Sequence, residues 1–457
     1  MSEVKIKLVS HASILIEAPD ITILTDPWFF GTAFNDGWEL YPIPNLEKID
    51  SIISDIDIIW ISHEHPDHFH FPTLKYLKTR CKNDVKIAFQ STNSQKVFNA
   101  LKGIGFNNFL AMPHLKKIRV SNSVELGCYA HRHLDSSLAV FVNDFFWLLN
   151  INDTELNNND LMIVKNSWGK PYSLLNQFSI AGSNGIKNSL VKNAAQILDK
   201  MINHHIGLEA EITVPFASFV RFARSDNEYM NKYSNTPIDV KARFDKEGLK
   251  LVLLSYESNE LVWDNLKSPP SNLNEVHEMA TRNFLEIYKT KHLSKLPDEF
   301  DYAILSNLEV KSAIEKKLNE WSSKTSSLFW RKLHPVYFKV TDWGGSIWCV
   351  DFNNLSFNES TKKKDYDISI SSQPLNYAFS TPFGIQTLGV SGRYKFNPKY
   401  KNVPLSWRLL RILSSLYNSG IYISLRGITR GSLLRWIWGR RIGIIAQIKQ
   451  QWSRFFP

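Results

Sequence analysis

Four histidines and an aspartate fall within the ten residues ISHEHPDHFH at positions 61–70. Imidazole and carboxylate side chains are the usual ligands of zinc and iron in proteins. The apolar, strand-like run IDIIWIS at 56–62 comes directly before them, and a sheet holds ligands in place when they lie just beyond a strand end. The spacing therefore predicts a metal centre at the edge of a sheet, with ligands from this segment at His63, His65, Asp67 and His68.

The alternating spacing divides these four ligands between two ions. His63 and His65 can reach one metal, while Asp67 and His68 turn toward a neighbouring one. The alternative interpretation is a histidine-rich surface loop. A loop in water has no use for so many ligands, and a core could satisfy them only at a cost in free energy. The sequence therefore favours the metal site.

This pattern resembles the signature of the metallo-β-lactamase superfamily, and further motifs follow in the order that the superfamily has them. The resemblance implies that Asp26, at the end of ITILTD, supports the metal site. It implies that His133 in AHRHLDSSLAV is a metal ligand, with His131 as the alternative, and that Asp153 in INDTEL bridges two metals. We expect Asp67, Asp26 and Asp153 to act in catalysis.

The superfamily's last histidine ligand is expected near residues 211–231, and those residues contain no histidine. Arg224 stands at roughly that place. We therefore expect one metal, or a second metal that has fewer ligands or a ligand from another part of the chain. The candidate substitutes are His70, His204, His205, Glu209 and Glu211.

A closer resemblance is to the catalytic domain of the CMP-N-acetylneuraminate hydroxylases. It rests on TDPWFFGTAFNDGWELYPIP, LLNQFSIAG and VPFASFVRFARSDNEYMN, and it continues into the C-terminal part. The resemblance implies a dinuclear iron oxygenase, a hydroxylase that acts on a small molecule such as an acidic sugar nucleotide.

Those hydroxylases also carry a Rieske domain, whose iron–sulfur cluster needs two cysteines and two histidines at short spacing. The three cysteines of this sequence, at positions 81, 128 and 349, are far apart. We therefore expect the electrons to come from an external electron-transfer protein.

A zinc-dependent hydrolase is the alternative activity. Zinc would lower the pKa of a bound water toward neutrality, and Asp67 could orient that water or accept its proton. An amide, ester or phosphoester would be the substrate. Both chemistries use the same ligands, so both stay open at this point.

Candidate substrate-binding residues flank the expected metal site. Trp28 and Trp38, with other aromatics of the same segment, could form the wall of a small-molecule pocket, although core packing is the alternative. Arg221 and Arg224 follow a predicted strand and could pair with a carboxylate or phosphate. Structural salt bridges are the alternative for both arginines.

Short strand-like runs alternate with amphipathic helical patterns through the first half of the chain. Together with the motifs, this predicts an α/β fold, an αββα metallo-β-lactamase sandwich, over residues 1–265. The segment KSPPSNLNE indicates a linker. A smaller α+β module is expected over 270–400, followed by a basic amphipathic C-terminal segment over 401–457.

The net charge of +10 arises from the last 57 residues alone. Residues 401–457 contain ten Lys or Arg and no acidic residue, so the 44 remaining basic residues equal the 44 acidic ones. Basic, Trp-bearing amphipathic segments favour an anionic membrane surface, and we expect residues 404–457 to bind one or to pack on the protein itself. Few cysteines and no signal peptide predict a cytoplasmic protein, peripheral at the inner face of the membrane. No nucleic-acid partner is expected.

Overall fold

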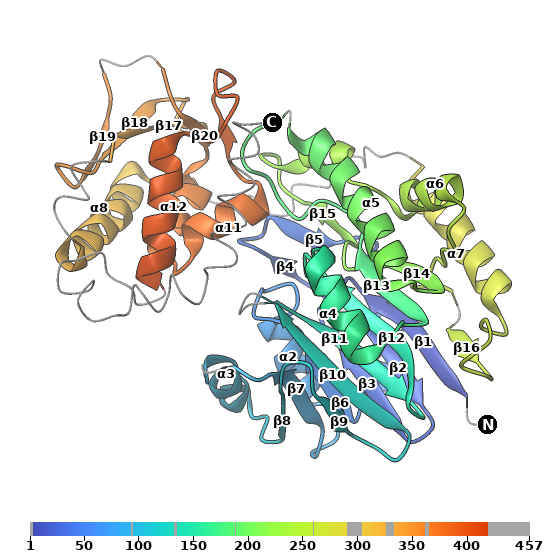
Figure 1. The fold of residues 1–457 in the computed structure, drawn as a ribbon. Helices are drawn as coiled ribbons and strands as arrows, with labels where there is room; N and C mark the ends of the chain where they lie inside the picture. The colour runs from blue at the N-terminus through green and yellow to red at the C-terminus, as the bar shows by residue number, and fades with distance from the viewer. Residues whose placement is uncertain are drawn as a thin grey trace.

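The computed structural model has a large first domain and a smaller C-terminal module beside it (Figure 1). It describes residues 3–92, 95–131, 135–187, 189–258, 260–289, 304–325, 333–361 and 365–418.

The first sheet has seven strands and mixes antiparallel and parallel pairs. The N-terminal strands pair antiparallel, and the later ones run parallel, so several strands end at the same edge. In order across the sheet, the strands are β16 (Leu261–Trp263), β1 (Val4–Ser10), β2 (Ser13–Ala18), β3 (Ile21–Thr25), β6 (Ile58–Ile61), β7 (Lys86–Gln90) and β8 (Phe109–Met112).

The second sheet has six strands, of which the last three along the chain are parallel. In order, they are β14 (Ile212–Phe216), β13 (Ser173–Gln177), β12 (Phe145–Asn152), β11 (Asp135–Val142), β10 (Val124–His131) and β9 (Lys117–Arg119).

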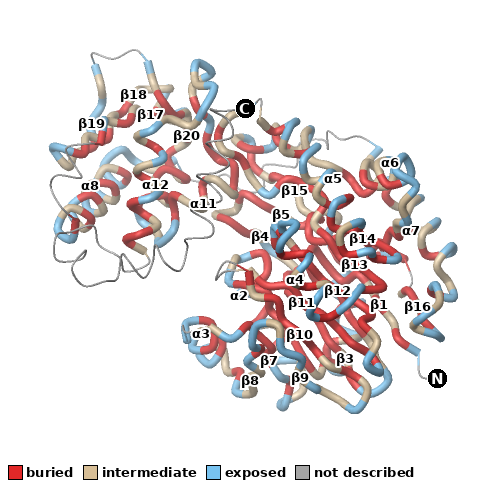
Figure 2. Tube along the Cα trace, viewed as in Figure 1, coloured by how far each residue is buried: buried red, intermediate tan, exposed pale blue. Residues whose placement is uncertain are grey.

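The two sheets pack face to face, and the alternation of side chains along β6 shows how both faces are used. Ile58 and Trp60 belong to the core between the sheets, whereas Ile59 and Ile61 join the core beneath the helices. A strand buried on both faces reads as a continuous apolar run, and Figure 2 shows buried residues along the central strands.

Helices cover the outer face of each sheet. The first sheet is covered by α1 (Leu46–Ile53), α2 (Phe71–Lys78) and α3 (Lys96–Ile104). The second is covered by α4 (Asn158–Trp168) and α5 (Ser189–Leu208). These four layers confirm the predicted αββα sandwich.

Smaller elements complete the first domain. A three-stranded sheet is formed by β15 (Val220–Phe222), β5 (Trp38–Leu40) and β4 (Thr32–Ala33). The remaining helices are the 3-10 helix η1 (Glu228–Tyr233), α6 (Pro237–Glu247) and α7 (Leu273–Ile287).

The C-terminal module has its own sheet and its own core. Its strands are β19 (Ser356–Glu359), β18 (Ile347–Asp351), β17 (Val336–Val340), β20 (Ile368–Ile370) and β21 (Lys395–Phe396). Its helices are α8 (Asn307–Lys324), α10 (Ser372–Ser380), α11 (Gly384–Ser391) and α12 (Leu405–Asn418).

Two helices lie differently from the expected division of the chain. Helix α7 falls within 270–400, but its Val276, Ala280 and Phe284 are part of the first domain's core. Helix α12 falls within 401–457, and its Trp407 and Leu410 are buried in the core of the C-terminal module. In both helices, an apolar stripe at helical spacing covers a neighbouring core.

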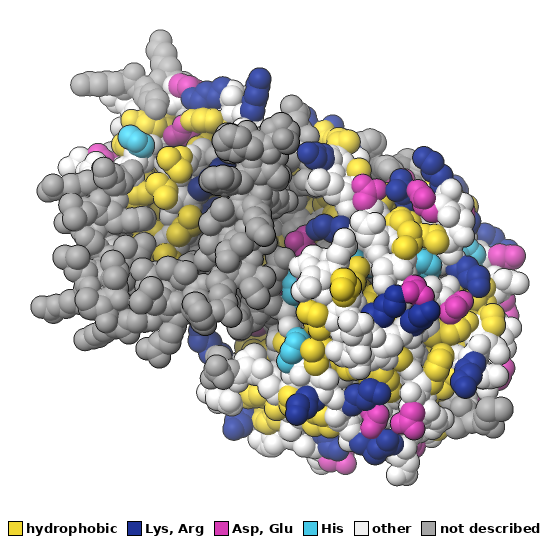
Figure 3. Space-filling view, viewed as in Figure 1, with side chains coloured by type: hydrophobic (Ala, Val, Ile, Leu, Met, Phe, Trp, Pro, Cys, Tyr) yellow, Lys and Arg dark blue, Asp and Glu magenta, His cyan; other side chains and the backbone are white. Residues whose placement is uncertain are grey.

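The start of the basic segment therefore packs on the protein itself, whereas residues 419–457 lie outside the described residues and their membrane role stays a prediction. Among the described helices, none has the length and apolarity needed to cross a membrane. Basic and acidic side chains are interspersed on the face of the first domain shown in Figure 3, in keeping with the balanced charge of residues 1–400.

Hydrogen bonds to the backbone of the module join it to the first domain. Ser183 N donates a hydrogen bond to Gly389 O over 2.7 Å, and Trp38 Nε1 donates to Val390 O over 2.9 Å. Gly182 has a φ of +128°, and a Cβ there would lie 2.6 Å from the Gly389 oxygen. Only glycine permits this approach, so the module is fixed against the loop that follows β13.

Candidate metal centre

The predicted ligands lie at one edge of the sandwich, where strands of both sheets end. His63 and His65 follow β6, and Asp26 follows β3, its parallel neighbour. Asp153 follows β12 in the opposite sheet. Because carboxyl ends of parallel strands meet at the same edge, residues far apart in sequence converge here.

The convergence is close. Asp153 Oδ2 lies 3.6 Å from His63 Nε2 and 3.7 Å from His68 Nε2. Asp67 Oδ2 lies 3.3 Å from His68 Nε2, and His63 Nε2 lies 2.8 Å from His65 Nδ1. The structure thus brings five of the predicted ligands together: His63, His65, Asp67, His68 and Asp153.

Two further ligand atoms lie in the cluster that the sequence interpretation missed. His11 Nε2, from the turn between β1 and β2, lies 3.4 Å from Asp67 Oδ2. Asp135 Oδ1, at the start of β11, lies 3.9 Å from His63 Nε2. Three groups have ligand atoms within 4.8 Å of one another: His11, Asp67 and His68; His63, His68 and Asp153; and His63, His65 and Asp135.

Buried hydrogen bonds orient two of the imidazoles. His68 Nδ1 is 3.1 Å from Asp26 Oδ2, and His63 Nδ1 is 2.9 Å from Ser62 Oγ. Each ring therefore presents Nε2 to the cluster. Asp26 is fully buried, and its Oδ1 accepts a hydrogen bond from Ser62 N over 2.7 Å. A carboxylate that holds a metal-binding histidine from behind fixes its tautomer and orientation, which assigns Asp26 to positioning.

The cluster has unused ligand atoms. Oδ1 of Asp67, Oδ1 of Asp153 and Nδ1 of His11 are buried without a hydrogen-bond partner. A buried carboxylate oxygen without a partner is costly, and a cation would satisfy it. Neutral imidazoles and carboxylates are also the donors that iron and zinc take. The residues present therefore fit a metal centre.

The charges of the cluster compensate one another. Burial alone would raise the pKa of Asp67, but the His68 and His11 imidazoles beside it hold that pKa well below its usual range. Burial opposes the charge on His68, yet Asp67, Asp153 and Asp26 raise its pKa well above the ordinary value. A positive charge is thus stabilised among these carboxylates, where a metal ion would place one.

The pKa values of His63 and Asp135 shift in the directions opposite to those of His68 and Asp67. Burial, followed by the neighbouring His68 and His65, lowers the pKa of His63 well below its ordinary value. Burial and the Asp153 carboxylate raise the pKa of Asp135 to about 6. A neutral imidazole is the form that binds a metal, and a second cation would favour the ionised form of Asp135.

The remaining histidines of the expected site lie elsewhere or are not described. His133 lies outside the described residues. His131, its alternative, is buried with Nε2 3.3 Å from Asp160 Oδ2 and belongs to none of the three groups.

None of the five candidate substitutes for the missing histidine joins the groups within the described chain. His70 caps α2 by accepting from Thr73 N. His204 bonds Asn176 and the carbonyl of Leu156, and His205 bonds Thr213. The two glutamates pair with lysines, Glu209 with Lys165 and Lys170, and Glu211 with Lys250. His11 is the histidine that lies beside Asp67 and His68.

The predicted substrate-binding residues make contacts within the protein. Trp28 and Trp38 are buried, with ring centroids 5.6 and 6.4 Å from the His11 ring. Arg221 Nη2 lies 3.0 Å from Glu39 Oε2, and Arg224 Nε donates to Asp36 O over 2.7 Å. The tryptophans thus shield His11, and each arginine has a partner within the protein.

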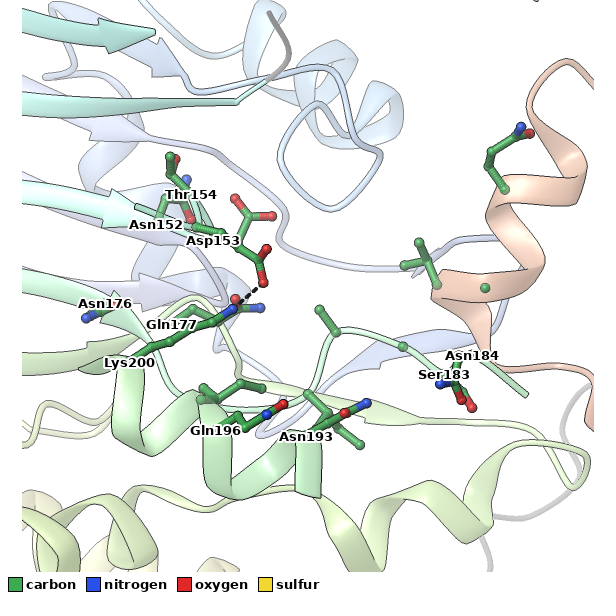
Figure 4. Close-up of a pocket in the computed structure, with 18 of the residues that line it drawn as sticks. Asn152, Asp153, Thr154, Asn176, Gln177, Ser183, Asn184, Asn193, Gln196 and Lys200 are labelled. Atoms are coloured by element: carbon green, nitrogen blue, oxygen red, sulfur yellow. Dashed lines mark hydrogen bonds and ion pairs between the residues drawn. The ribbon is translucent and has the colours of Figure 1, made fainter. Parts of the chain in front are cut away.

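A polar cavity of about 450 Å³ opens beside Asp153. Figure 4 shows Asn152, Asp153 and Thr154 on one side of it and Asn193 and Gln196 of α5 on another. It is the place from which a small molecule could reach the Asp153 carboxylate.

Comparison with known proteins agrees with this architecture. Residues 5–156 match the Beta-lactamase superfamily domain. All the residues of the three ligand groups lie within this range. The first domain therefore has the metallo-β-lactamase fold. It also resembles cytidine monophosphate-N-acetylneuraminic acid hydroxylases.

The chain is 39% identical over 119 residues to the hydroxylase of Asterias rubens, an alignment that covers 26% of this chain and 17% of that protein. It is 24% identical over 400 residues to the hydroxylase of Danio rerio, which covers 80% of this chain and 64% of that protein. The chain thus spans less than two thirds of the length of either relative.

Among solved structures, a metallo hydrolase from Ignicoccus hospitalis is 14% identical with a TM-score of 0.42, over 57% of this chain and 99% of that one. CmlA, a diiron β-hydroxylase from Streptomyces venezuelae, is 15% identical with a TM-score of 0.37, over 55% of this chain and 53% of that one.

Proposed function

We propose that this protein is a metal-dependent oxygenase that hydroxylates a small molecule with the help of two iron ions. The observation that carries the proposal is the position of Asp153. Its carboxylate lies 3.6 Å from His63 and 3.7 Å from His68, between two sets of imidazole and carboxylate ligands. A carboxylate placed in this way is suited to bridge two ions.

The two ions would have separate ligand sets. His63, His65 and Asp135 would hold one ion, and His11, Asp67 and His68 would hold the other. Mixed imidazole and carboxylate donors with several oxygens suit iron, and the named relatives are hydroxylases. When bound, iron supplies the activation of dioxygen, and the protein supplies binding, orientation and exclusion of water.

The chain's own residues serve this chemistry in distinct ways. Asp26 and Ser62 fix the rings of His68 and His63, and Trp28 excludes water from the side of His11. The substrate would enter through the cavity beside Asp153. By likeness to the relatives, whose names specify a sialic acid nucleotide, we propose an acidic sugar nucleotide as substrate.

Reduction of dioxygen consumes electrons, so the proposal includes an electron donor. The three cysteines lie in different parts of the fold: Cys81 follows α2, Cys128 is in β10 and Cys349 is in β18. We place the donor outside these 457 residues.

A zinc-dependent hydrolase is the second candidate function, and the match of residues 5–156 to the Beta-lactamase superfamily domain favours it. Asp67, held ionised by His68 and His11, would orient or deprotonate the attacking water.

Metal analysis of protein produced in iron-supplemented medium separates the two candidates. For the oxygenase we expect about two iron ions per chain and dioxygen consumption that depends on an added reductant. His63→Ala should lose the bound iron and the dioxygen consumption. The matched control His205→Gln should keep both, because His205 bonds Thr213 and does not line the cavity. Tightly bound zinc with hydrolysis that continues without oxygen would overturn the oxygenase in favour of the hydrolase.

A further inference from the structure

The cavity beside Asp153 is built by both domains. The first domain supplies the ends of β12 and β13, the loop 180–184 and one face of α5, and the C-terminal module supplies Gln386, Gly389, Val390 and Arg411. In Figure 4 a helix of the module closes the side opposite Asp153. Pockets for small molecules are often found at such domain interfaces, and 450 Å³ is within their usual range.

The lining carries polar groups that the protein itself does not use. In the part of the chain that the structure describes, the side chains of Gln177, Asn193 and Gln196 make no hydrogen bond. Other lining side chains are engaged: Asn176 bonds His204 over 3.0 Å, and Lys200 pairs with Glu155 over 2.5 Å. The free amides can donate to and accept from the hydroxyl and amide groups of a ligand.

Arg411 is the cation of the lining that lacks an acidic partner. Lys200 is neutralised by Glu155, whereas no carboxylate among the described residues lies within salt-bridge distance of Arg411. Arg411 lies on α12 and is partly buried. An arginine at a cavity wall without an acidic partner is a binding group for a carboxylate or a phosphate, which its guanidinium can engage through two hydrogen bonds.

Packing and hydrogen bonds hold the backbone of Arg411 at the cavity wall. Trp407 and Leu410, on the same helix, are buried in the module's core. Gln386 Nε2 donates to Arg411 O over 3.0 Å, and Gly389 O accepts from Ser183 N of the cavity loop over 2.7 Å. The helix therefore needs no rearrangement to present Arg411 to the cavity.

We propose that Arg411 is the anion-binding residue of a substrate pocket shared by the two domains. The ligand is a small molecule with hydroxyl or amide groups, bound by the free amides, and one carboxylate or phosphate, bound by Arg411. The inference rests on the proposed function, because it assigns the pocket to the substrate of the Asp153 site. It makes the C-terminal module a determinant of specificity.

Two pairs of probes that differ only in charge test the assignment by calorimetry. N-acetylneuraminic acid is compared with its methyl ester, and cytidine monophosphate with cytidine, each at up to millimolar concentration. We expect the wild-type protein to bind one of the charged members about 10- to 100-fold more tightly than its neutral partner. The pair that shows this preference tells whether the anion is a carboxylate or a phosphate.

Arg411→Gln should remove the preference, lowering the affinity for the charged probe by about 10- to 100-fold while leaving the neutral probe unchanged. The matched control is Arg408→Gln, an exposed arginine on the same helix that does not line the cavity, and it should bind as the wild type does. If Arg411→Gln fails to fold, Asn193→Ala serves instead and should weaken the charged and neutral probes alike.

Equal binding of charged and neutral probes by the wild type, an unchanged preference in Arg411→Gln, or no binding of any probe would overturn the proposal. Iron content and reductant-dependent dioxygen uptake are measured on the same samples. If the wild type shows the charge preference but has neither bound iron nor reductant-dependent dioxygen uptake, the oxygenase is refuted and the binding pocket stands. Their presence without the preference would refute the role of Arg411 alone.

Discussion

Two groups of buried histidines in the first domain differ in whether their ring atoms and neighbours are satisfied. On α5, His204 has Nδ1 at 3.0 Å from Asn176 Nδ2 and Nε2 at 3.0 Å from Leu156 O, and His205 Nδ1 is 2.9 Å from Thr213 Oγ1. At the strand ends, buried oxygens of Asp67 and Asp153 have no partner. Burial of histidine alone therefore does not identify a metal site, whereas unsatisfied ligand atoms around it do.

The largest expected effect contrasts His63 with His204. His63→Ala removes a group that faces both Asp153 and Asp135. The affinity for the metal should therefore fall by more than about 100-fold, and activity should be lost. His204→Gln should keep full metal content, because its partners are an amide and a carbonyl. Metal analysis of both variants after dialysis is the measurement, and equal metal loss in both would erase the difference between the two groups.

The next effect contrasts His11 with His205. His11→Asn should weaken the ion held by Asp67 and His68 by about 10- to 100-fold while the other ion stays bound, so that stoichiometry falls from two toward one. His205→Asn should leave two. Titration of the metal-free proteins with ferrous iron under anaerobic conditions gives both stoichiometries. Two ions with unchanged affinity in His11→Asn would show that His11 is a packing residue.

His63 and His11 show what the sequence could and could not reveal about the site. His63 to His68 are contiguous and follow an apolar strand, so their convergence on a metal follows from local spacing. His11 lies 52 positions before His63 in an ordinary-looking turn, and its approach to Asp67 depends on the tertiary packing of β1 and β2 beside β3 and β6. The nearest sequence signal was the missing histidine in 211–231, which called for a ligand from another part of the chain.

The fold, too, has features that local sequence patterns predict and features that depend on tertiary packing. Strand alternation and strand-end motifs carry the αββα sandwich. The packing of α7 on the first domain depends on which core its apolar stripe meets, and periodicity does not specify that partner. Asp135 was not predicted as a ligand, because the nearby His131 and His133 are the residue type expected to bind metal in that segment.

A smaller effect concerns His70, a satisfied histidine near the cluster. Burial lowers its pKa to about 4, against about 6.5 in the unfolded chain. Its contribution to stability is therefore present above pH 6.5 and is lost as the pH falls toward 4, up to about 3 kcal/mol of the free energy of unfolding. His70→Asn keeps a capping side chain and should lose this dependence. Urea unfolding of the metal-free proteins between these pH values measures the difference, and parallel pH profiles would contradict it.

The smallest effect extends the comparison to arginines. Arg221 is paired with Glu39 at 3.0 Å, whereas Arg411 has no acidic partner among the described residues. Arg221→Gln should lower the free energy of unfolding by about 1–3 kcal/mol and leave probe binding unchanged. Thermal unfolding together with calorimetry checks both parts, and a loss of probe affinity without a loss of stability would return Arg221 to the substrate site.

Anomalous diffraction from iron-loaded crystals, recorded on both sides of the iron absorption edge, tests the central claim most directly. The account predicts two iron peaks, one among His63, His65 and Asp135 and one among His11, Asp67 and His68, with Asp153 between them. A map without peaks at this edge of the sandwich, or with metal bound elsewhere in the chain, would contradict it.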